Sequence, residues 1–63
     1  MNSINYYVSY AMQDGQPAKI ELGTTWRIPL KYTDNEGVTY EVFDTMRKVL
    51  KRRNELRETN NGY

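Results

Sequence analysis

Large apolar side chains recur at even-numbered positions along four short segments, and this alternation constrains the fold more than any other feature of the chain. A period of two residues is typical of strands with one buried face. Because the segments share one parity, we expect their apolar side chains to point to the same side of a sheet. The segments are 4–12 (Ile4, Tyr6, Val8, Tyr10, Met12), 18–22 (Ala18, Ile20, Leu22), 25–33 (Trp26, Ile28, Leu30, Tyr32) and 38–42 (Val38, Tyr40, Val42).

A glycine-containing turn separates the first two segments. Opposed residues of a hairpin face the same way, so the shared parity requires the numbers of paired residues to sum to an even value. A two-residue turn would break this condition, whereas a three-residue loop over residues 13–15 satisfies it, with Gly15 in the left-handed region. The sequence therefore predicts a first hairpin in which Tyr10 lies opposite Ala18.

The last two segments are joined by a second turn of the same chemistry. Asp34 and Gly37 have the spacing of a type I turn that ends in a glycine bulge, which predicts Tyr32 opposite Tyr40. Between the two hairpins lies the stretch 23–25, which fits either a tight turn or a bend within one long strand. Two hairpins of this kind give a sheet of three or four strands.

The apolar period changes to a helical one after residue 43. Asp44 is a good N-cap, and the following pattern predicts an amphipathic helix over residues 44–58. Its apolar positions are Met46, Val49, Leu50 and Leu56. The expected fold is α+β: a small antiparallel sheet, built from residues 1–43, packs against one C-terminal helix, with a polar tail at 59–63.

The length of the chain leaves room for one domain and one hydrophobic core. At 63 residues and 7.5 kDa, a second unit is excluded, so we expect a single domain over residues 1–63. A core this small depends on its largest side chains. We therefore expect Trp26, on the even phase of the third segment, to be buried and its replacement by alanine to unfold the domain.

The composition argues against catalysis and metal binding. The chain contains neither cysteine nor histidine, which removes thiolate chemistry, the commonest general base and the commonest ligand for borderline metals. Asp34 and Glu36 share a turn, where both carboxylates are solvated. We expect a protein that is not an enzyme and has no cofactor, no metal and no small-molecule substrate. The apolar runs are too short for a membrane span or a signal peptide, so a cytoplasmic protein is expected.

Charge is distributed unevenly along the chain although its net value is only +1. Residues 1–44 sum to −3 and residues 45–63 to +4, so the predicted helix is a basic stripe beside an acidic sheet. Such a stripe can meet phosphates or an acidic protein surface, or it can simply solvate the outer face of the helix. The candidate contact residues on the helix are Arg47, Lys48, Lys51, Arg52, Arg53 and Arg57.

The odd-numbered phase of the sheet is the second candidate contact surface. It is mostly small or polar, which also suits an ordinary solvated face, but it includes residue types that dominate the energetics of interfaces. On the expected parity these side chains point away from the helix. The candidates are Tyr7, Arg27, Lys31 and Phe43.

These features favour a small protein-binding module that acts by surface contact with a larger macromolecule. An effector, inhibitor or regulator of the kind found among phage and mobile-element accessory proteins has this size and lacks catalytic groups. Two alternatives remain. The chain can bind nucleic acid through its basic helix or its sheet face, or it can assemble with copies of itself through its edge strands or by joining acidic sheet to basic helix.

Overall fold

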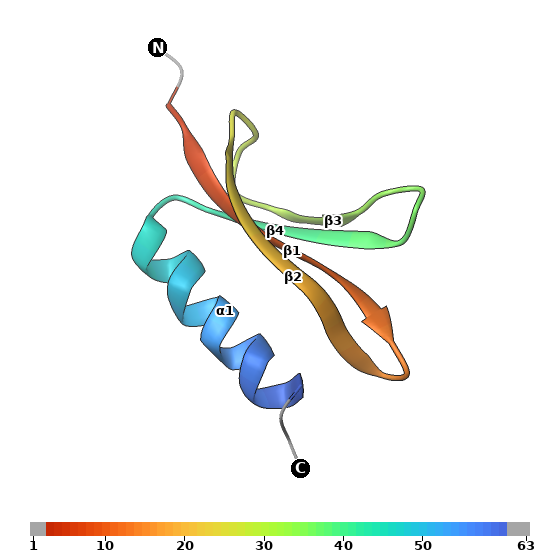
Figure 1. Cartoon of the computed structure of the whole chain (residues 1–63). Coiled ribbons are helices and arrows are strands. Elements are labelled where there is room, and N and C mark those ends of the chain that lie inside the picture. The colour runs from red at the N-terminus through yellow and green to blue at the C-terminus, as the bar shows by residue number, and fades with distance from the viewer. Residues whose placement is uncertain (1–2, 61–63) are drawn as a thin grey trace.

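A four-stranded antiparallel sheet packs against one C-terminal helix in the computed structural model, which describes residues 3–60 and confirms the predicted α+β fold (Figure 1). Of the predicted polar tail, Thr59 and Asn60 belong to the helix, and residues 61–63 lie outside the described residues. The elements are β1 (Asn5–Gln13), β2 (Gln16–Thr25), β3 (Lys31–Thr33), β4 (Val38–Phe43) and α1 (Met46–Asn60).

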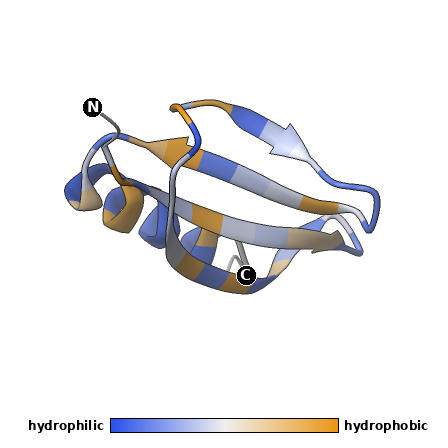
Figure 2. Cartoon of the chain, turned by 90° about the horizontal axis from the view of Figure 1, so that it is seen from above, coloured by the Kyte–Doolittle hydropathy of each residue, from blue (hydrophilic) through white to orange (hydrophobic). Residues whose placement is uncertain are grey.

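The strand order is β2-β1-β4-β3, so the two hairpins are joined through their strands β1 and β4 at the centre of the sheet. The connection from β2 to β3 must then pass from one edge of the sheet to the other. Residues 26–30, which we name the crossing loop, make this connection across the ends of β1 and β4 (Figure 2). The stretch 23–25 lies within β2 and is neither a turn nor the start of a new strand.

The first hairpin differs from its predicted register. A two-residue turn takes the place of the predicted three-residue loop and leaves Ala11 opposite Ala18. A bulge follows, in which one strand carries an extra residue and Lys19 adopts a positive φ of 56°. Beyond the bulge, the numbers of paired residues sum to an even value, as they do for Val8 and Leu22. The predicted three-residue loop was therefore wrong. A two-residue turn together with a bulge satisfies the same parity condition.

The second hairpin has the predicted register. Tyr32 lies opposite Tyr40, and the Asp34 amide donates to the Val38 carbonyl at 2.9 Å. Gly37 adopts a φ of 86°, in the left-handed region that residues with a side chain rarely enter. The turn therefore forms as its Asp and Gly spacing predicts.

The two hairpins present opposite parities to the helix, which corrects the expectation of one shared apolar face. The central pairing places Tyr6 opposite Phe43, so even-numbered residues of β1 share a face with odd-numbered residues of β4. We name the side that α1 covers the helix face and the other side the open face. The helix face carries Tyr6, Val8, Tyr10, Leu22, Thr39, Glu41 and Phe43, and the open face carries Tyr7, Tyr32, Val38, Tyr40 and Val42.

The helix begins two residues later than predicted, because Thr45 and not Asp44 caps it. The Thr45 Oγ1 accepts a hydrogen bond from the Lys48 amide at 3.3 Å, as an N-cap side chain does. The Asp44 carboxylate instead pairs with the Lys48 ammonium at 3.0 Å. Asp44 thus contributes charge to the first turn without capping it.

The core lies between α1 and strands β1 and β2. Val8, Tyr10, Val49 and Leu56 form its buried cluster, and Tyr6, Ile20, Leu22 and Phe43 pack against it. Two of the helix positions predicted for the core lie at its margin, since Met46 is 42% exposed and Leu50 is 37% exposed. The helix therefore buries a narrower stripe than its sequence suggests.

Trp26 is not part of the core, and the strand predicted over residues 25–33 is reduced to β3. Trp26 is 67% exposed and Ile28 is 73% exposed. Both lie in the crossing loop, whose path across strand ends prevents it from pairing as a strand, and Pro29 has no N–H for a ladder. The prediction that alanine at position 26 unfolds the domain consequently loses its basis.

Candidate interaction surfaces

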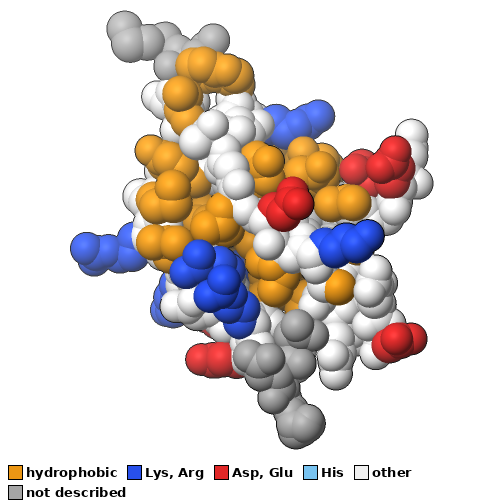
Figure 3. Space-filling model, viewed as in Figure 1, with side chains coloured by type: hydrophobic (Ala, Val, Ile, Leu, Met, Phe, Trp, Pro, Cys, Tyr) orange, Lys and Arg blue, Asp and Glu red, His pale blue; other side chains and the backbone are white. Residues whose placement is uncertain are grey.

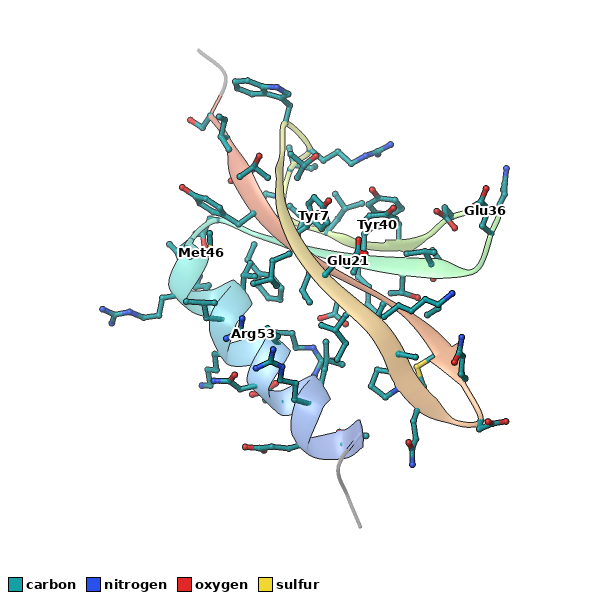
Figure 4. All side chains as sticks on the ribbon, in the orientation of Figure 1. Tyr7, Glu21, Glu36, Tyr40, Met46 and Arg53 are labelled. Carbon is teal, nitrogen blue, oxygen red and sulfur yellow. The ribbon has the colours of Figure 1, made fainter. Side chains whose placement is uncertain are left out.

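Three tyrosines from three strands stack on the open face (Figure 4). The rings of Tyr32 and Tyr40 lie nearly parallel, at 11°, with centroids 5.0 Å apart. The Tyr7 ring meets Tyr40 edge-on, at 5.4 Å and 65°. The Arg27 guanidinium lies 4.6 Å from the centroid of Tyr32, within cation–π range. We name Tyr7, Tyr40 and Tyr32, with Arg27 over the outer ring, the tyrosine stack.

Gly23 provides the room for the first ring of the tyrosine stack. Gly23 lies opposite Tyr7 in the β1–β2 ladder. A Cβ atom at position 23 would come within 2.5 Å of the Tyr7 ring. Glycine in a strand marks a close approach of this kind. The ring of Tyr7 is thus held over the backbone of β2 with Tyr40 on its other side.

Two carboxylates help to raise the pKa of Tyr40 in the tyrosine stack. The pKa of Tyr40 is raised, first by burial and then by the negative charges of Asp34 and, more weakly, Glu21, together with the neighbouring tyrosines. The nearest cation that the structure places on the stack is Arg27. The open face therefore combines aromatic rings with two nearby carboxylates, Asp34 and Glu21, and one cation, Arg27.

The crossing loop is held in place by hydrogen bonds to both central strands. The Asn5 Nδ2 in β1 donates to the Arg27 carbonyl at 2.7 Å, and the Val42 amide in β4 donates to the Leu30 carbonyl at 2.8 Å. These bonds fix the loop near both of its ends. The loop therefore presents the exposed Trp26 from a backbone that is already positioned.

The structure brings together only half of the residues predicted for the sheet surface. Tyr7 and Arg27 both belong to the tyrosine stack on the open face, where Tyr7 contacts Tyr40 and Arg27 lies over Tyr32. Phe43 packs against the core and Lys31 lies opposite Glu41, so both belong to the helix face, and the prediction that they share a side with Tyr7 was wrong. The cause is the reversed parity of the second hairpin.

Sequence reasoning missed Tyr32 and Tyr40 as surface residues. Both lie on the even phase, which was assigned to the core, and the register within their hairpin is correct. The missing information is the pairing of β1 with β4, which sets the parity of the second hairpin relative to the first. A turn-based argument cannot supply it, since no turn joins β1 to β4.

On the helix face, Arg52 forms an ion pair with the buried Glu41. The Arg52 Nε donates to Glu41 Oε1 at 2.7 Å and its Nη2 donates to Oε2 at 3.1 Å, a two-pronged contact. The Tyr10 hydroxyl also donates to this carboxylate, and Glu55 contacts Arg52 at 3.3 Å. Arg52, predicted to be free for a partner, is therefore engaged within the fold.

The pKa values of this cluster follow from its contacts. Burial alone would raise the pKa of Glu41, but the hydrogen bonds from Arg52 and Tyr10 outweigh burial, and the pKa lies below its ordinary value. The pKa of Tyr10 is raised by burial and by its bond to the Glu41 carboxylate. The hydrogen bond to Glu41 raises the pKa of Arg52 further above its usual range. The pair is therefore fully ionised at neutral pH.

The remaining predicted cations of the helix differ in their surroundings. Lys48 is paired with Asp44. The side chains of Arg47, Lys51 and Arg57 are exposed, and Arg53 is half-buried. The basic stripe that the sequence suggests is therefore divided, because Arg52 and Lys48 have carboxylate partners within the chain.

Residues 3–60 contain no pocket and no cluster of three or more metal-ligating side chains. No described helix is long and apolar enough to cross a membrane. The chain matches no protein-family model, no curated protein and no solved structure.

Proposed function

We propose that the chain is a small, non-enzymatic, cytoplasmic effector or regulator that docks on a larger protein through its open face and crossing loop. The observation that carries the proposal is the tyrosine stack on the side of the sheet that α1 leaves uncovered. Tyrosine, tryptophan and arginine are the residue types that supply most binding energy at protein interfaces. Here Arg27 of the crossing loop lies over the ring of Tyr32 in the tyrosine stack, and the exposed Trp26 precedes it in the same loop.

The proposed surface is ordered before it meets a partner. Hydrogen bonds at Arg27 and Leu30 hold the crossing loop, and Gly23 positions the Tyr7 ring. A surface that is already ordered loses little conformational entropy on binding, which increases affinity for a given buried area. The exposed Trp26 can then enter a partner without a rearrangement of the loop.

Charge favours a protein over a nucleic acid as the partner of the open face. Platforms that bind single-stranded nucleic acid combine aromatic rings with a positive groove along the backbone. The tyrosine stack has the rings, but Asp34 and Glu21 add negative charge that would repel phosphates. A protein surface with apolar and cationic side chains fits this combination better.

Nucleic-acid binding through the helix is the second candidate function. It is supported by the exposed side chains of Arg47, Lys51 and Arg57. Binding of this kind weakens steeply with salt, by roughly one unit of the logarithmic slope for each phosphate contact. Neutralising two of these cations should then reduce the slope and leave binding through the open face unchanged.

Capture from a lysate with and without nuclease, followed by affinity measurements on the identified partner, tests the proposal. We expect Tyr32→Ala combined with Arg27→Ala to weaken binding about 30-fold or more, as loss of a roughly 2 kcal/mol hot spot does. Met12→Ala is the matched control, because Met12 is also exposed, at 54%, but lies near the turn of the first hairpin and on the helix face. Capture that disappears with nuclease would favour the second candidate, and an intact mass that is a multiple of the chain would favour self-assembly.

A further inference from the structure

Four side chains follow one flank of α1 at spacings of four, three and four residues. Met46, Leu50, Arg53 and Arg57 share this spacing, which is that of the seam along which two helices pack. We name these four residues the α1 flank. Its N-terminal half is apolar and its C-terminal half is cationic. A helix face with this spacing usually packs against another helix.

The α1 flank faces away from β4, towards the edge strand β2. Val49 and Leu56 point at the sheet, and Arg52 extends to one side of them to reach Glu41 in β4. At 100° per residue, Met46 and Arg53 lie on the other side of the buried stripe. The helix packs over β1 and β2, so this side of the helix adjoins the free edge of the sheet.

The apolar half of the α1 flank is exposed although it borders the core. Met46 is 42% exposed and Leu50 is 37% exposed. Figure 3 views the molecule from the β2 side and shows hydrophobic side chains extending from its upper end down beside the helix, with basic side chains lower along the helix. Both Met46 and Arg53 project from α1 in Figure 4. The strip is apolar above and basic below.

The cationic half of the α1 flank lacks carboxylate partners among the described residues. Arg52 and Lys48, on other sides of the helix, each contact a carboxylate within 4 Å. Neither Arg53 nor Arg57 has such a contact with any described residue, and the buried Arg53 Nε has no acceptor among them. Because Nε itself is closed to solvent, a carboxylate brought by a partner would pair with the half-buried Arg53 guanidinium at its outer nitrogens.

We propose that the α1 flank binds an acidic amphipathic helix of a partner protein. Two apolar side chains of that helix lie against Met46 and Leu50, and two carboxylates that follow them at the same spacing pair with Arg53 and Arg57. A second copy of the chain does not fit, because its own flank would set arginines against arginines in parallel or against apolar side chains in antiparallel packing. Nucleic acid would leave the apolar half uncovered.

This surface lies on the other side of the sheet from the tyrosine stack, so the inference is independent of the proposed function. With two docking surfaces on opposite sides, the chain would bind two proteins at once and connect them. An amphipathic helix binds through side chains at helical spacing, and the α1 flank offers two apolar and two cationic side chains at that spacing. The open face remains available for the other partner.

Titration of the isotope-labelled chain with a designed peptide tests the inference by NMR. The peptide is a helix of about 20 residues that carries Leu and Glu at the complementary spacing. We expect the largest chemical-shift changes at Met46, Leu50, Arg53 and Arg57, and at least tenfold weaker binding to Arg53→Glu combined with Arg57→Glu. Arg47→Glu combined with Lys51→Glu is the matched control, with the same change of charge on another side of α1, and we expect less than threefold weakening.

Additional arms separate the alternatives. Arg57→Glu alone alters an exposed side chain, so its binding defect can be measured even if the change at the half-buried Arg53 impairs folding. Tyr32→Ala should leave peptide binding unchanged, which keeps this test distinct from that of the open face. The inference is overturned if a peptide with Lys in place of Glu binds equally well, or if shift changes centre on the tyrosine stack. It is likewise overturned if duplex DNA or anionic vesicles, but not the peptide, perturb the α1 flank.

Discussion

The two faces of the sheet invert the usual distribution of polar and apolar side chains. The helix face buries a carboxylate, Glu41, with Arg52 and Tyr10 around it, whereas the open face leaves stacked tyrosines without a covering layer. Residues 3–60 contain one helix with which to cover a sheet of two sides. The comparison indicates that the helix face stabilises the fold, through apolar packing and one ion pair, and that the open face is available for contact.

Removal of Arg52 should have the largest effect on stability. Arg52→Ala leaves the buried Glu41 carboxylate without its ion-pair partner, and we expect a loss of about 3 kcal/mol in the free energy of unfolding, measured by urea denaturation. Lys48→Ala removes a solvent-exposed pair with Asp44 and should leave the free energy of unfolding almost unchanged. Equal losses in the two variants would show that the helix face does not depend on its internal pair.

Acid should weaken the same pair, with a smaller effect than deletion of Arg52. The pKa of Glu41 in the folded chain lies below its ordinary value of 4.5, so its contribution to stability is present above that pH and is lost as the pH falls through the lowered pKa. Thermal unfolding followed from pH 7 to pH 2 should show this decline. Glu41→Gln, which cannot ionise, should flatten that part of the profile, and an unchanged slope in this variant would contradict the assignment.

Gly23→Ala should disturb the open face while leaving the helix face intact. The added methyl group displaces the Tyr7 ring from its place over β2, at an expected cost of about 1–2 kcal/mol. Ring-current shifts of Tyr40 in NMR spectra would change, while the signals of Val49 and Leu56 would not. Unchanged Tyr40 signals would mean that Tyr7 and Tyr40 do not stack in solution.

Trp26→Ala should have little effect on stability, within about 0.5 kcal/mol, because the side chain is 67% exposed. Cooperative thermal unfolding near the wild-type midpoint would support its place in the crossing loop. A loss of several kcal/mol would restore Trp26 to the core and remove it from the proposed interface. The same variant should weaken partner binding, so stability and binding separate at this residue.

Local chemistry predicted the elements of the fold, and non-local pairing determined what they expose. The turn at Asp34 and Gly37 and the helix after residue 43 follow from short-range patterns, and both are present. The first hairpin shows the limit of parity arguments, because the bulge at Lys19 achieves with a two-residue turn what a longer loop would have achieved. An apolar alternation that includes Trp26 can belong to a loop when the chain has to cross the sheet.

The candidate surfaces were harder to predict than the fold for the same reason. Tyr7 and Arg27 were identified from their residue types, but the tyrosines that join them were assigned to the core. Arg52 was grouped with the free cations of the helix, because nothing in the sequence places Glu41 beneath it. Both errors arise because the sequence does not reveal the register between β1 and β4, which is set by packing across the whole domain.

The central position of the β1–β4 pair also has a kinetic consequence. Each hairpin can form by itself on a microsecond timescale, but strands far apart in sequence pair only after a larger loss of chain entropy. Tyr32 and Tyr40 pair within one hairpin, but Tyr7 comes from the other, so the stack of three rings is complete only after that late step. A half-folded chain would therefore have an incomplete recognition surface, and a partner that binds the whole stack would draw the population towards the complete fold by mass action.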